Sequence, residues 1–98
     1  MPQSLSRGLG FETGESVLTY ELLEEQAYSL GRAGRKVEAA LAELRAAEGP
    51  ARAPALKRAA DAVWGFFVQR EVLGLRDRRA IIAQYEIPRE VLARLGAL

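Results

Sequence analysis

Cysteine and histidine are both absent from this 98-residue sequence. Without cysteine the chain cannot form disulfide bonds, zinc–thiolate sites, iron–sulfur clusters or a thiol nucleophile. Without histidine it lacks the most common general base, the most common metal ligand and the usual pH switch. An active site would have to use carboxylates, hydroxyl groups, lysine or arginine. We therefore predict no catalytic residue, no metal site and no cofactor.

Long apolar runs are missing as well. No stretch approaches the roughly 20 apolar residues that a transmembrane helix requires. Residues 1–7 hold one arginine, but the apolar core of a secretory signal peptide does not follow it. Apolar residues make up 49% of the chain and charged residues 28%, a balance typical of a folded soluble domain. We expect a single cytoplasmic domain that does not enter membranes.

The net charge of +1 excludes a strong overall field, but the charges are unevenly distributed. Residues 1–30 carry one base and five acids, residues 31–58 carry seven bases and three acids, and residues 59–98 carry six bases and five acids. An acidic first segment followed by a basic second segment suits antiparallel self-association. A solvated surface of mixed charge is the alternative interpretation.

Apolar and small residues recur at alternating spacings of three and four in the first half of the chain. This period of 3.5 is typical of a helix that packs along one narrow seam. We predict one long helix over residues 13–48, preceded by a flexible N-terminal arm over residues 1–12. The predicted seam consists of Tyr20, Leu23, Ala27, Leu30, Gly34, Val37, Leu41 and Leu44.

Two glycines, Gly31 and Gly34, interrupt this helical pattern. Each lowers helix stability by about 1 kcal/mol relative to alanine. The glycines either divide the helix into two or allow another helix to approach closely. The seam keeps its phase across both of them, whereas a break would usually reset the phase, so we predict a continuous helix.

A second, aromatic-rich helix is predicted over residues 54–73. Residues 50–54 read as a short stiff linker, and Pro54 suits the first position of the helix that follows. Gly74 suits the C-terminal cap of that helix.

The apolar surface of this second helix is unusually wide. Bulky side chains from Val63 to Val68 cover an arc of about 200°, wider than the stripe of an ordinary surface helix. Trp64, Phe66 and Phe67 cannot all face the core of one small chain. The second helix, about 28 Å long, also cannot cover a first helix of about 50 Å. A two-fold dimer of long hairpins would cover the remaining seam.

Two short helices are predicted over residues 77–96. Asp77 suits the N-cap of the first, which should run to about Tyr85. Pro88 disfavours helix in the residue before it, so Glu86 and Ile87 should form a turn before the last helix.

This C-terminal segment also resembles a helix-turn-helix DNA-binding motif. The side chains that would contact nucleic acid are Arg78, Arg79, Arg89 and Arg94. Three departures count against this function: Ile82 replaces a small residue, Glu86 replaces the turn glycine, and Glu90 would face phosphates. The low net charge also gives little of the basic surface that phosphate binding requires. We favour a helical corner that closes the bundle, and we expect no nucleic-acid partner.

Three carboxylates, Glu21, Glu24 and Glu25, can share one face of the long helix and could bind a hard cation together with a symmetry mate. The histidine that usually completes such sites is missing. A solvated acidic surface is the preferred interpretation.

Four stretches of the chain resemble a family of short, uncharacterised bacterial proteins of about this length. The stretches are residues 30–35, 62–71, 74–77 and 87–96. The resemblance covers most of the chain and implies an all-helical fold. It implies no activity, so it transfers no functional residue.

Together these elements predict an all-α fold: a long helical hairpin with a short C-terminal helix pair, packed as a homodimeric helical bundle. The expected function is a non-enzymatic interaction or structural module, with a second copy and a further, unidentified protein as possible partners. A small DNA-binding regulator and a small enzyme or ligand-binding protein are the alternatives. The residues expected at the core or the dimer interface are Val37, Leu41, Leu44, Val63, Trp64, Phe66 and Phe67.

Overall fold

The computed structural model describes residues 14–96, and within this range the chain is helical without any β-strand. The prediction of an all-α fold is confirmed. The expected N-terminal arm over residues 1–12 lies outside the described residues. The elements are α1 (Gly14–Ala46), a short 3₁₀ helix η2 (Gly49–Ala51), α2 (Arg52–Val72), α3 (Arg78–Tyr85) and α4 (Arg89–Gly96).

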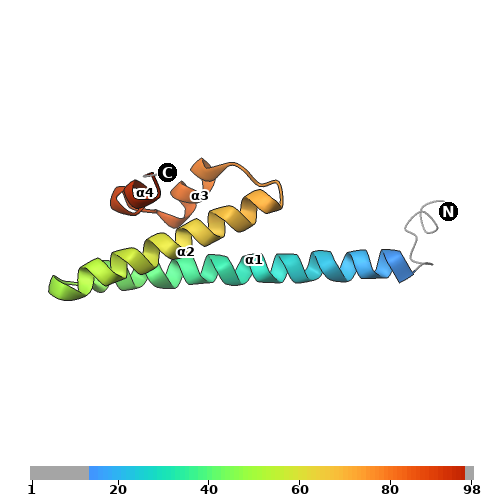
Figure 1. The fold of residues 1–98 in the computed structure, drawn as a ribbon, viewed down its shortest axis with the longest axis horizontal. Helices are drawn as coiled ribbons and strands as arrows, with labels where there is room; N and C mark the ends of the chain where they lie inside the picture. Colours follow the sequence, from blue (N-terminus) through green and yellow to red (C-terminus); the bar gives the residue numbers. More distant parts are fainter. Residues whose placement is uncertain (1–13, 97–98) are drawn as a thin grey trace.

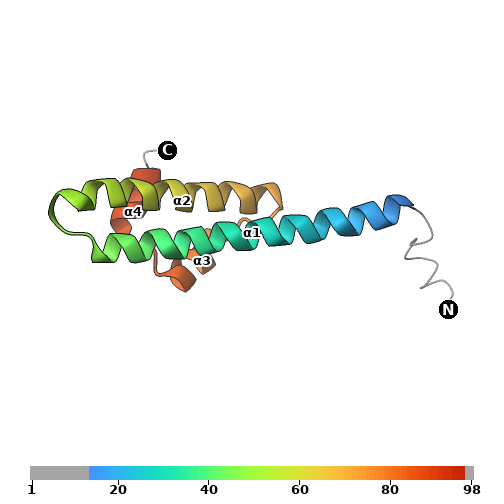
Figure 2. The same ribbon diagram turned by 90° about the horizontal axis from the view of Figure 1, so that it is seen from below.

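Helices α1 and α2 form an antiparallel hairpin, and α3 and α4 lie against one side of it (Figure 1). The molecule is elongated, with extents of 63 × 20 × 20 Å. Much of this length comes from α1, whose N-terminal part continues alone beyond the end of α2 (Figures 1 and 2).

Helix α1 is one continuous element of 33 residues that passes through both glycines. Gly34 is buried, and a Cβ atom at this position would lie 2.6 Å from the hydroxyl oxygen of Tyr85 and 3.5 Å from the Phe66 ring. A Cβ atom at Gly31 would meet only the Arg35 side chain, at 3.5 Å. The Tyr85 and Phe66 side chains therefore occupy the space that a side chain at position 34 would need, whereas no such contact explains Gly31.

The second helix begins earlier than expected. The stiff linker predicted over residues 50–54 is wrong, because η2 leads directly into α2 at Arg52. Pro54 consequently lies within the first turn of α2 and not at its first position. The N–H groups of a first turn have no partner inside the helix, so proline is tolerated at any of these positions.

Local signals account for the ends of the other helices. Gly74 adopts a left-handed conformation with φ +85°, and the next residue, Leu75, donates its N–H to the carbonyl of Arg70 at 2.8 Å. Asp77 caps α3 by accepting a hydrogen bond from the N–H of Ala80 at 3.3 Å. The end of α2 at Gly74 and the start of α3 at Asp77 therefore agree with the caps predicted from the sequence.

Glu86 forms the turn between α3 and α4 in a backbone conformation that residues other than glycine rarely adopt. Glu86 has φ 54° and ψ 51°, the left-handed region that glycine usually occupies at this position. The N–H of Ile87 then bonds to the carbonyl of Ile82 at 3.0 Å, and Pro88 leads into α4. The turn brings α4 back onto α2.

The core lies where the hairpin meets the C-terminal pair. Ala55 and Ala59 of α2 are fully buried. No polar or charged side chain is buried within residues 14–96. The buried apolar residues are Val37, Leu41, Leu44, Ala55, Ala59, Ala60, Val63, Phe66, Phe67, Ile81, Ile87, Val91 and Leu95.

Polar contacts at the surface fix the register of the hairpin. The Arg58 guanidinium donates two hydrogen bonds to the Glu43 carboxylate, at 2.7 and 3.1 Å. These bonds lower the pKa of the Glu43 carboxyl below its ordinary value, so the pair stays ionised. At the other end of α2, the Gln69 side-chain amide donates to the Ser29 hydroxyl at 2.9 Å.

We predict opposite effects of alanine at the two glycines of α1. Gly34→Ala should lower the free energy of unfolding by about 1–2 kcal/mol, because the new methyl group pushes Tyr85 off Phe66 and this overpacking exceeds the gain in helix propensity. Gly31→Ala should raise it by up to about 1 kcal/mol, because only the flexible Arg35 side chain must move. Urea denaturation of both variants measures the difference. Equal stabilisation by both would contradict the role given to Tyr85.

Candidate functional site

The N-terminal part of α1 projects from the hairpin as a lone helix (Figures 1 and 2). The contact between Ser29 and Gln69 lies close to the end of the stretch that α2 accompanies. Every residue from 14 to 28 is exposed except Ser16, which is half-buried. We call residues 14–28 the projecting segment.

Large apolar side chains cover much of the projecting segment, and between 43% and 63% of the surface of each one is exposed. Three of the predicted seam positions, Tyr20, Leu23 and Ala27, are among its exposed residues. An isolated helix of about 15 residues is only marginally stable in water, so helices of this length usually depend on packing. The large apolar residues exposed here are Val17, Leu18, Tyr20, Leu22, Leu23 and Tyr28.

The same segment is purely acidic. It contains no lysine or arginine, and its four carboxylates are Glu15, Glu21, Glu24 and Glu25. Within residues 14–96 of the single chain, no group of three or more potential ligands could hold a metal ion, so the geometry adds no support to the cation site weighed as an alternative to a solvated acidic surface.

A basic groove lies immediately after the projecting segment, where α1 meets the end of α2. Its volume is about 420 Å³, and no carboxylate lines it. None of the ion pairs found within residues 14–96 uses the three bases of this groove. The lining consists of Arg32, Arg35 and Lys36, with Ser29, Ala39 and Gln69 among the other residues.

One of the groove bases is oriented by an aromatic ring. The Arg32 guanidinium carbon lies 4.9 Å from the centroid of the Tyr28 ring, so this base stacks on the last residue of the projecting segment. The acidic segment and the basic groove are therefore directly adjacent on one continuous helix. The uneven charge of the sequence indicated both regions, but it did not identify the three bases as neighbours in one groove.

Six of the seven residues predicted for the core or interface are buried within the chain itself; they are Val37, Leu41, Leu44, Val63, Phe66 and Phe67. Trp64 differs, because 40% of its surface is exposed. It lines a shallow pocket of about 250 Å³ together with Arg94 and Leu95 of α4. Val68 and Val72 are also exposed, so the apolar arc of α2 extends past the core.

The four arginines of the helix-turn-helix hypothesis occupy different environments. The Arg78 guanidinium donates to the Glu71 carboxylate at 2.8 and 3.2 Å and lies 4.8 Å from the centroid of the Phe67 ring. It therefore fastens α3 to α2. Arg79, Arg89 and Arg94 are exposed.

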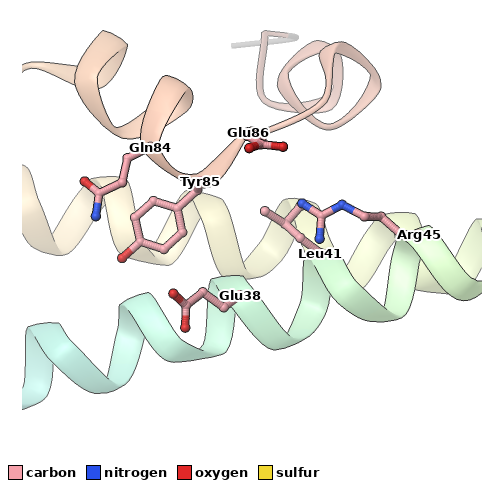
Figure 3. A pocket seen from close by; sticks show the side chains of 6 residues that line it. All are labelled: Glu38, Leu41, Arg45, Gln84, Tyr85 and Glu86. Atoms are coloured by element: carbon pink, nitrogen blue, oxygen red, sulfur yellow. The ribbon is translucent and has the colours of Figure 1, made fainter.

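A polar cleft separates α1 from the end of α3 (Figure 3). It has a volume of about 370 Å³, and Leu41 and Tyr85 provide its apolar part. Its charged groups, Glu38, Arg45 and Glu86, are exposed and of both signs. A catalytic pocket usually presents polar groups that converge in a shielded space, and this cleft does not.

Comparison with known proteins identifies one family. A family of unknown function, DUF6665, matches residues 4–98, nearly the whole chain. The searches of curated proteins and of solved structures gave no match. The resemblance to a family without known activity is thereby confirmed. In residues 14–96 no helix combines the length and apolar character needed to span a membrane.

We predict that Arg78→Ala lowers the free energy of unfolding by about 1 kcal/mol, because it removes a half-exposed ion pair with Glu71 and the stacking on Phe67. Arg79→Ala is the matched control, since Arg79 is an exposed neighbour of the same type. It should change stability by less than about 0.5 kcal/mol. Thermal denaturation compares the two variants, and equal effects would contradict the structural role of Arg78.

Proposed function

Since the chain belongs to DUF6665, a family of unknown function, we propose its role from its surfaces alone: the protein is a homodimeric interaction module without enzymatic activity. In this proposal the projecting segment is the surface that binds the second copy. The observation that carries the proposal is the row of large apolar side chains left in solvent on residues 14–28.

Exposed apolar surface of this kind supports an interaction role. Single apolar residues at a protein surface are normal, but contiguous patches mark sites of association. Here six large apolar side chains lie within twelve consecutive residues, from Val17 to Tyr28. A partner that covers them would also stabilise a helical segment that no other helix of residues 14–96 accompanies.

The shape of the chain supports the same conclusion. The radius of gyration is 18.6 Å, whereas a compact domain of about this length has a value near 13 Å. The excess arises because one helix extends past its neighbours and not because the hairpin is loose. The hairpin has a buried core of its own, and the exposed large apolar side chains lie mostly on the projecting segment, with a smaller group on one side of α2.

A second copy is the partner that we favour. A two-fold interface joins the same surface of both subunits, so each subunit must carry both halves of a complementary pair. Each chain carries both an acidic segment and a basic groove on α1, so two identical copies can supply both halves of the pair. DNA binding is not proposed, because Arg78 is held by contacts inside the chain and net charge is close to zero.

The mass of the protein in solution tests this proposal. We predict that light scattering coupled to size-exclusion chromatography gives twice the 10.7 kDa of the single chain. The double variant Leu18→Gln, Leu22→Gln should raise the dimer dissociation constant at least about a hundredfold, because two leucines per subunit would lose their apolar contacts. Glutamine preserves helix propensity and net charge.

Val72→Gln is the control for this experiment, because Val72 is an even more exposed apolar residue on α2, outside the projecting segment. It should leave the mass unchanged. A wild-type protein with the mass of a single chain at every concentration would overturn the proposal.

A further inference from the structure

We propose that each projecting segment lies antiparallel in the basic groove of the second copy, so that two such contacts join the dimer. This inference rests on the proposed homodimer and specifies where and in which direction the segment binds. Three observations support it: the positions of the charged residues on α1, the helix face on which these residues lie, and the lengths of the projecting segment and of the basic groove.

The docking face of the projecting segment combines apolar and acidic residues. Leu18, Leu22 and Glu25 follow each other at spacings of four and three, so they share one face of the helix, with Glu21 beside them. More than half of the surface of each leucine is exposed. The face therefore offers two apolar anchors flanked by carboxylates.

The groove presents the complementary pattern on the continuation of the same face. Ser29, Arg32, Lys36 and Ala39 extend the spacing of three and four beyond Glu25, and all of them line the groove. Its small alanine side chain leaves room for a bulky residue, while the aliphatic parts of the basic side chains can pack against leucine. The charged ends of these bases remain available for carboxylates.

An antiparallel arrangement brings opposite charges together. With the two-fold axis near Tyr28, Glu25 lies opposite the partner's Arg32, and Glu21 lies opposite the partner's Lys36. Leu18 then lies opposite the partner's Ala39, a large residue against a small one. Symmetry repeats each of these pairs.

A parallel arrangement would bring like charges together. The four carboxylates of one projecting segment would face the same four carboxylates of the other, and both basic grooves would remain empty. Because neither segment contains a base, no change of register within a parallel pair of segments relieves this repulsion.

The lengths of the two surfaces also agree. Residues 14–28 of a helix extend over about 22 Å, and the groove from Ser29 to Ala39 extends over about 15 Å. The docking face from Leu18 to Glu25 is about 10 Å long, so it fits within the groove. The segment can therefore reach every base of the groove without a change in the fold of the hairpin.

Charge reversal tests the pairing. Glu21→Lys and Lys36→Glu should each raise the dimer dissociation constant about tenfold, since each creates two like-charge contacts per dimer. The double variant should return to within about threefold of the wild type, because it restores both pairs with reversed polarity. Arg79→Glu is the control for Lys36→Glu, since it makes the same change of charge on α3, outside the groove, and should have no effect.

Sedimentation equilibrium at low and high salt measures these constants. The wild-type dimer should weaken as salt increases. Single variants that behave as the control does, or a double variant that fails to recover, would overturn the docking in the groove.

Cross-linking tests the direction independently. The native chain has no cysteine, so single cysteines can be placed at will. In the antiparallel dimer, a short bis-maleimide should link Leu18→Cys to Ala39→Cys in a mixture of the two variants. Neither variant should link to itself, because the two copies of each cysteine would lie about 30 Å apart along the helix.

The outcomes separate this inference from the proposed function. Linking of Leu18→Cys to itself indicates a parallel dimer, which overturns the antiparallel docking and leaves the homodimer intact. A stable dimer that gives no mixed product also overturns the docking alone. A wild-type protein that remains monomeric contradicts the homodimer itself.

Discussion

The structure depends on a mismatch in length between two packed helices. Helix α1 has 33 residues and α2 has 21. Because α2 ends shortly after the contact between Gln69 and Ser29, no other helix of residues 14–96 covers the N-terminal part of α1, and α3 and α4 pack against the hairpin. Apolar residues of α1 thus continue beyond the part of the helix that α2 buries. These exposed residues are the basis of the proposed dimer.

Small residues help the hairpin and the C-terminal helices to form a buried core within one chain. Ala55 and Ala59 are fully buried in α2, and Gly34 admits the Tyr85 side chain, which packs edge-on against Phe66 with ring centroids 5.5 Å apart. The core formed in this way contains no buried polar side chain in the described part of the chain. Exposed apolar surface is therefore not spread over the molecule, and most of it lies on the projecting segment and one side of α2.

Features governed by local chemistry were predictable from the sequence, and features governed by tertiary packing were not. The caps at Gly74 and Asp77 and the continuity of α1 follow from backbone conformation and spacing. The start of α2 was misplaced because Pro54 fits several positions in a first turn. The exposed side of Trp64 depends on where α4 packs, and the groove beside Lys36 depends on how α1 packs next to Gln69 of α2. The sequence therefore indicated the charges of the candidate site but not its shape.

Hydrogen exchange of the backbone amides of residues 14–28, followed over a range of protein concentrations, tests most directly whether a second copy covers the projecting segment. We predict slow exchange at high concentration and fast exchange on dilution, while the amides of α2 stay protected throughout. Fast exchange in residues 14–28 at every concentration would contradict the pairing, because the segment would then be an uncovered helix that frays freely.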